Sequence, residues 1–111
     1  MDARLPAHLE VSGIIRMAEA AEGFAMITAK GEKDAGTILI LTIYRGESAV
    51  LFEKMPQLDG SRPFIAAKQQ SAEKPNEIYE YLDRRKKQDP DLWVLEVDIA
   101  DGAQFIASLP R

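Results

Sequence analysis

The stretch Thr37-Ile-Leu-Ile-Leu-Thr-Ile-Tyr44 decides the fold of this chain. As a strand, it carries Ile38, Ile40 and Tyr44 on one face and Leu39, Leu41 and Ile43 on the other. A strand that is apolar on both faces needs cover on both, whereas an antiparallel sheet in a small domain ordinarily leaves one face in water. The sequence offers helices for about one face. We therefore expect a partner subunit or a ligand to cover the other.

Length and composition bound the chain to one small domain. It has 111 residues, 46% of them hydrophobic, which suits a single globular core. We therefore interpret residues 1–111 as a single α+β domain. The 18 acidic and 14 basic residues give a net charge of -4 and a pI near 5.0, which disfavours nucleic acid and anionic membranes as partners.

The chain contains no cysteine, which excludes disulfides, thiolate nucleophiles and cysteine-ligated metals. Its first residues lack the apolar core of a signal peptide, and no run approaches the roughly 20 apolar residues of a membrane helix. These two observations predict a cytoplasmic protein without a membrane segment.

Hydrophobic periodicity predicts two helices and five or six strands. We expect the helices at 9–22 and 75–88, and Pro90 ends the second one. The strands are expected at 24–30, 37–44, 48–54, 64–68, 92–99 and 103–107, the last two joined by a turn at Asp101-Gly102. The predicted fold is α+β, with an antiparallel sheet built as a meander plus a C-terminal hairpin and with two helices mainly on one face.

The loop Gly31-Glu-Lys-Asp-Ala-Gly36 has the glycine spacing of a phosphate-binding loop without its chemistry. Thr37 and Ile38 stand where Lys and Ser or Thr are required, and the loop leads into a strand rather than a helix. A hairpin loop in which both glycines take positive φ accounts for the pattern. The functional alternative keeps Lys30, Lys33 and Asp34 as a small polar site at one end of the sheet.

The segment Asp89-Pro-Asp-Leu-Trp93 is the most distinctive local pattern, with two carboxylates around a proline and the only tryptophan of the chain. Asp89 and Asp91 could form an acid/base pair or bind a cation. The alternative is turn chemistry, with Trp93 in the core. If the segment is functional, we expect Trp93 to anchor an interface.

The remaining polar residues indicate no catalytic or metal site. His8 is the only histidine, so a metal would need carboxylates for its other ligands, and no serine has the spacing of a nucleophile elbow. A solvated or capping role suits His8. The basic run 84–87 suits the C-terminal dipole of a helix better than it suits nucleic acid. We expect no catalytic residue, no bound metal and no cofactor.

Three segments stand in the same order as in a small bacterial family. They are residues 11–24, the loop 30–36 before an apolar strand, and residues 89–96 before Asp101-Gly102. On these segments the chain resembles the family catalogued as domain of unknown function fourteen ninety-one, over nearly its whole length apart from 57–74. The resemblance implies a bacterial, cytoplasmic protein and no activity that can be transferred.

Two classes of function follow from the sequence. The first is a non-catalytic binding or assembly module that self-associates as a homodimer. We expect the interface between its subunits to include Ile38, Ile40 and Phe52. Any further protein or small-molecule partner of this module is unknown. The second is a small-ligand-binding protein or enzyme with a polar site at one end of the sheet, with Lys30, Asp34, Asp89 and Asp91 as candidate residues. We expect the two acidic loops, the loop Gly31–Gly36 and the segment Asp89–Trp93, not to meet in one site.

Overall fold

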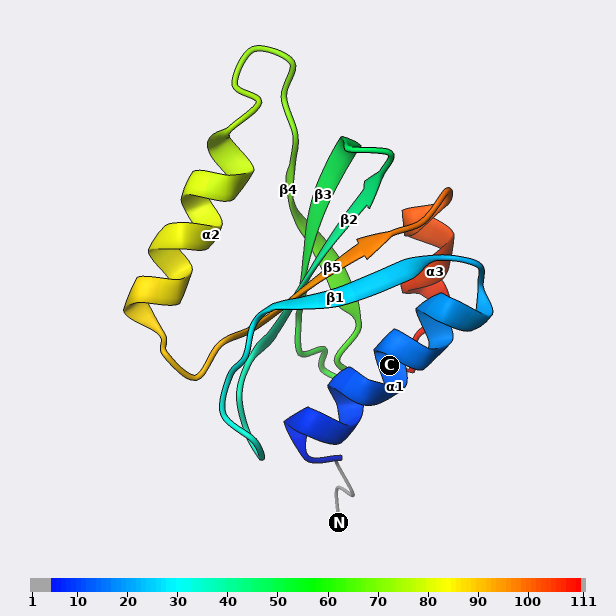
Figure 1. The fold of residues 1–111 in the computed structure, drawn as a ribbon. Coiled ribbons are helices and arrows are strands. Elements are labelled where there is room, and N and C mark those ends of the chain that lie inside the picture. The colour runs from blue at the N-terminus through cyan, green and yellow to red at the C-terminus, as the bar shows by residue number, and fades with distance from the viewer. Residues whose placement is uncertain (1–4, 111) are drawn as a thin grey trace.

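The computed structural model describes residues 5–110, which form an α+β fold with three helices and a five-stranded sheet (Figure 1). The elements in chain order are α1 (Ala7–Ala20), β1 (Phe24–Ala29), β2 (Ile38–Tyr44), β3 (Glu47–Lys54), β4 (Phe64–Gln69), α2 (Glu77–Gln88), β5 (Trp93–Asp98) and α3 (Gly102–Ser108). The strand order is β1-β5-β2-β3-β4. Within the described residues, no helix is long and apolar enough to cross a membrane.

The sheet is mixed, so the prediction of an antiparallel sheet is wrong at one pair. β5 runs parallel to β2, from Trp93 opposite Ile38 to Asp98 opposite Ile43, whereas the other three pairs are antiparallel. The reason is that α2 carries the chain back to the end of the sheet where β2 begins, and a parallel pair needs such a crossover. β5 then lies between β1 and β2, which leaves β1 and β4 as the two edges.

The C-terminal hairpin predicted at Asp101-Gly102 is instead the start of α3. The Asp101 carboxylate accepts the backbone N–H of Gln104 at 3.1 Å, which caps the helix. Phe105, Ile106 and Leu109 are buried at helical spacing. The expected strand at 103–107 is therefore wrong, because this Asp-Gly pair begins a helix rather than a turn.

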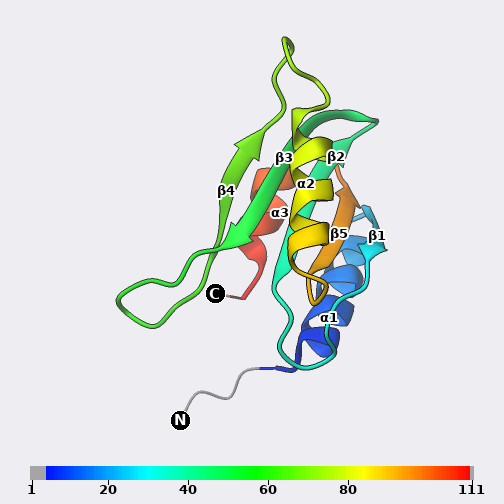
Figure 2. The ribbon, with the colours of Figure 1, turned by 90° about the vertical axis from the view of Figure 1, so that its left-hand side faces the viewer.

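Helices cover both faces of the sheet, as the two views together show (Figures 1 and 2). The core beneath α1 and α3 includes Ile38 and Ile40 of β2, and the core beneath α2 includes Leu39 and Leu41. The prediction that β2 needs cover on both faces is confirmed. The prediction of two helices mainly on one face is wrong, because the chain folds a third helix and places α2 alone on the opposite face.

The residues predicted to form an interface are buried, so the premise that they lie on an uncovered face of the sheet is wrong. Ile38, Ile40 and Phe52 are at most 8% exposed and pack in the core with α1 and α3 residues. The physical reason is α3, which adds cover that the sequence interpretation did not provide. These three residues therefore stabilise the subunit itself, and a homodimer must use another surface.

Candidate functional site

The loop Gly31–Gly36 packs against the start of β5, so the two acidic segments do meet. The Glu32 N–H donates to the Asp91 carbonyl at 3.0 Å, and the indole N–H of Trp93 donates to the Glu32 carbonyl at 2.7 Å. The expectation that the two acidic loops do not meet in one site is wrong for their backbones, which are in contact. Parallel pairing of β5 with β2 places the residues before Trp93 beside the loop that precedes β2.

The same loop caps α1. The backbone N–H groups of Ala7 and His8 donate to the carbonyls of Asp34 and Lys33 at 3.0 and 2.9 Å, and Nδ1 of His8 lies 3.0 Å from the Lys33 carbonyl. The first N–H groups of a helix have no partner inside the helix, and α1 has no side-chain cap. The loop thus joins α1 to β5, which favours a structural role.

Close backbone approach explains the two glycines of this loop. A Cβ atom would lie 2.2 Å from the Asp91 carbonyl oxygen at Gly31 and 2.3 Å from it at Gly36. The predicted positive φ is wrong for both, because the positive-φ glycines within residues 5–110 are Gly46 and Gly60. The glycines are needed here because a side chain would collide with the β5 entry.

The side chains predicted as a polar site take separate roles. Lys30, Asp34 and Asp91 are exposed, whereas Trp93 is 2% exposed in the core. The half-buried Asp89 carboxylate accepts the Asp91 N–H at 3.0 Å in the turn after α2. Backbone groups and the Trp93 indole thus make the contacts between the loops. This arrangement favours the turn-and-core interpretation over an acid/base pair.

No metal site is formed by the part of the chain that the structure describes. Residues 5–110 contain no group of three or more His, Asp or Glu side chains placed to hold a metal ion.

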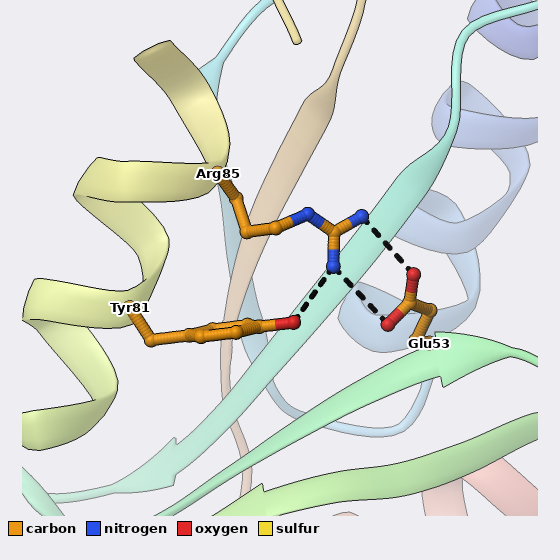
Figure 3. A network of polar contacts seen from close by, with 3 residues as sticks. All are labelled: Glu53, Tyr81 and Arg85. Carbon is orange, nitrogen blue, oxygen red and sulfur yellow. Dashed lines mark hydrogen bonds and ion pairs between the residues drawn. The ribbon is translucent and has the colours of Figure 1, made fainter. Parts of the chain in front are cut away.

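A polar network fastens α2 to the sheet (Figure 3). The Arg85 guanidinium donates to the two carboxylate oxygens of Glu53 on β3 at 3.3 and 3.1 Å, and to the Tyr81 hydroxyl at 2.8 Å. The hydrogen bond to Glu53 raises the pKa of Arg85 above its ordinary value. Lys68 of β4 lies 5.0 Å above the Tyr81 ring. These contacts give the basic end of α2 a structural role.

We expect Arg85→Met to lower the free energy of unfolding by about 1–2 kcal/mol, because Glu53 then keeps a half-buried carboxylate without its cation. Chemical denaturation measures this. Lys87→Met is the matched control, since Lys87 is exposed near the end of the same helix, and it should shift stability by less than about 0.5 kcal/mol. Equal losses in the two variants would contradict a stabilising role for the network.

β1 is an edge strand whose residues, Phe24-Ala-Met-Ile-Thr-Ala29, carry no charge. Phe24 is 64% exposed, Met26 45% and Ile27 44%. Pairing with β5 puts Phe24 and Met26 on the α2 side of the sheet and Ile27 on the α1 side. Edge strands present unpaired backbone groups and are usually protected by Lys, Pro or a bulge. β1 has only a register shift near Ala29.

The apolar surface beside β1 extends toward α2. Tyr79 of α2 is 41% exposed. Burial, and then the nearby Glu96 carboxylate, raise the pKa of Tyr79 above its ordinary value, and Glu96 is the residue that pairs with Met26. Phe24 and Met26 therefore lie exposed at the open edge of β1, and Tyr79 lies near Glu96, the partner of Met26. Sequence reasoning predicted the strand but missed this surface; its lack of charge was the available signal.

A cavity of about 800 Å³ opens at the carboxyl ends of β2 and β5. Its apolar wall is formed by Met17, Phe24, Ile99 and Phe105, and its charged groups are Glu22, Arg45, Asp98 and Asp101. Three carboxylates against one guanidinium give the cavity an acidic rim. Sequence reasoning missed it because these residues meet only when β5 runs parallel to β2.

Arg45 is already engaged at this rim. Its backbone N–H donates to the Asp98 carboxylate at 3.3 Å, and its guanidinium lies 5.0 Å above the ring of Tyr44. The Asp101 carboxylate caps α3. Glu22 also lines the cavity; it lies immediately before Gly23, in the turn that leads into β1, and is exposed.

Comparisons with known proteins agree with this fold. A crystal structure of a DUF1491 family protein from Caulobacter crescentus CB15 matches with a TM-score of 0.82 and 30% identity, covering 96% of this chain and 98% of that chain. An NMR structure of a DUF1491 family protein from the same organism matches with a TM-score of 0.76 and 31% identity, covering 96% and 94%. The solution structure of protein Atu0922 from A. tumefaciens gives 0.76 and 28%, covering 97% of each chain.

A comparison with the curated proteins finds no match. The family model described as a protein of unknown function, DUF1491, matches residues 5–107. The resemblance seen in the sequence is thereby confirmed, and the chain belongs to the DUF1491 family, whose function is unknown.

Proposed function

We propose that the protein is a non-catalytic assembly module of the bacterial cytoplasm that forms a homodimer through its β1 edges. The observation that carries the proposal is β1 itself, an uncharged edge strand with Phe24, Met26 and Ile27 exposed. Two such edges related by a two-fold axis perpendicular to the sheet would pair antiparallel. The result is one continuous sheet twice as wide as that of the subunit.

A second copy of the chain suits this edge because the same uncharged strand then lies on both sides of the contact. The net charge of -4 opposes association of two copies over most of their surface, and β1 contributes nothing to that repulsion. Pairing would cover Phe24 and Met26 on one face and Ile27 on the other. Fully burying side chains of this size contributes about 1.5–3 kcal/mol each.

The structural roles of the predicted polar residues support a non-catalytic module over the alternative of an enzyme or small-ligand protein at the loop end of the sheet. Asp89 forms a turn, Trp93 fills the core, and the loop Gly31–Gly36 joins α1 to β5. These residues are used to hold the fold together.

We expect Met26→Lys to dissociate the homodimer, because it places two like charges beside the two-fold axis on the paired edge. Ile65→Lys is the matched control, since Ile65 is 42% exposed and lies on β4, the other edge strand. Size-exclusion chromatography with light scattering, at the same protein concentration for both variants, should give the mass of one chain for Met26→Lys and the mass of two chains for Ile65→Lys. The same mass for both variants would contradict an interface at β1.

A further inference from the structure

The acidic cavity and Lys30 lie at opposite ends of β1. Glu22, Gly23 and Phe24 line the cavity at the start of the strand, and Lys30 directly follows its last residue. Both Glu22 and Lys30 are exposed. The strand between them is about 20 Å long at the usual rise per residue, so the two side chains cannot meet within one subunit.

Two-fold pairing of the β1 edges brings these ends together. Directly opposed residues in an antiparallel pair point to the same face of the sheet. The two-fold axis must therefore pass between one residue and its own copy in the other subunit, and not between two consecutive residues of the strand. With the axis beside Met26, that residue faces its own copy and Phe24 faces Thr28 of the partner subunit. Beyond Phe24 the chain leaves the strand, because Glu22 has a positive φ of 65° in the turn after α1, so Lys30 of the partner subunit passes beside this turn. This register pairs residues 24–28, more of β1 than a register centred on Ala25, and unlike a register centred on Ile27 it does not include Ala29, where the pairing with β5 is shifted.

We propose, on the basis of the homodimer described above, that Lys30 of each subunit enters the acidic cavity of the other. The aliphatic stem of a lysine can lie along the apolar wall of such a cavity while its ammonium group reaches a carboxylate. Glu22, in the turn directly before β1, is one carboxylate of this cavity, and Asp98 and Asp101 also line it. The register shift near Ala29 offsets Lys30 by about one residue and turns its side chain to the α1 side of the sheet, the side on which Met17 and Phe105 of the cavity lie.

Charge complementarity identifies the occupant as a second copy of the chain. The cavity carries an excess of carboxylates, and Lys30, the residue that arrives beside it, is a cation. By symmetry each homodimer contains two such sites, and each cavity is completed by a residue that its own subunit cannot supply.

Charge reversal tests the contact. Lys30→Glu and Glu22→Lys should each weaken the homodimer by about tenfold in dissociation constant, because each places like charges together at both symmetric sites. The two changes combined should restore the dissociation constant to within about threefold of the unmodified protein. Lys74→Glu is the matched control, since it alters the net charge as Lys30→Glu does but at an exposed position before α2, and it should leave the constant unchanged.

Disulfide formation reads the register directly, because the chain has no cysteine of its own. Met26→Cys should form a disulfide between subunits on mild oxidation. Phe24→Cys alone and Thr28→Cys alone should form no disulfide between subunits, since each residue lies about 13 Å from its own copy. The two substitutions combined in one chain should form one.

The outcomes separate this inference from the homodimer on which it rests. Cross-linking at Met26→Cys together with rescue by the double charge reversal supports the Lys30 site. The Lys30 site is wrong if Phe24→Cys or Thr28→Cys alone cross-links the subunits, or if the double charge reversal weakens the homodimer as much as either single change does. Either result still leaves a homodimer through β1. An unmodified protein that stays monomeric overturns both.

Discussion

Trp93→Ala is expected to lower the free energy of unfolding by about 3–5 kcal/mol, the cost of emptying a large aromatic site in a core. Trp93 is buried beneath α1, and its indole N–H donates to the Glu32 carbonyl at 2.7 Å. The substitution therefore removes core packing and also releases the loop that caps α1. Chemical denaturation of Trp93→Ala in the Met26→Lys background measures the loss without a contribution from subunit dissociation.

Trp93→Phe separates the two contributions. Phenylalanine keeps most of the packing but cannot donate to Glu32, so a smaller loss of about 1–3 kcal/mol is expected. If Trp93→Ala cost less than about 1 kcal/mol, Trp93 would be outside the cooperative core and the packing described here would be wrong.

Gly36→Ala is expected to cost about 3 kcal/mol, at the upper end for overpacking a well-packed site. The added Cβ would lie 2.3 Å from the Asp91 carbonyl oxygen and 2.8 Å from Cδ1 of Trp93. Because the nearest atom belongs to the backbone, the collision cannot be relieved by rotating a side chain. The loop or the β5 entry must move, which strains the hydrogen bonds between them.

Gly13→Ala is the matched control for this prediction. Gly13 lies inside α1, and a Cβ there meets nothing within 4 Å. Alanine is the better helix former, so this variant should gain about 0.5–1 kcal/mol in stability. Chemical denaturation compares the two. A Gly36→Ala variant as stable as the unmodified protein would show that the loop does not pack on β5.

The local elements could be read from the sequence, and their arrangement could not. Both apolar faces of β2 follow from its alternation, and the expected range 37–44 matches Ile38–Tyr44 closely. The Asp101-Gly102 pair is ambiguous, since it can form a hairpin turn or begin a helix. Gln104 three residues after Asp101 completes a capping-box pattern, which was the local signal for α3.

Prediction of the candidate site from the sequence was limited in the same way, because the site depends on which strands pair. Asp89 and Trp93 behave as the structural alternative predicted, in a turn and in the core. The meeting of the loop Gly31–Gly36 with Asp91 depends on parallel pairing of β5 with β2, which no local pattern encodes. Likewise, the position of β1 at the sheet edge depends on β5 entering between β1 and β2.

Sedimentation equilibrium of the unmodified protein over a wide range of concentrations tests the proposed β1 homodimer most directly. The proposal predicts a mass that rises to about twice the 12.3 kDa of one chain and then stays constant, as expected for a closed two-fold assembly. A mass of 12.3 kDa at every concentration would contradict it.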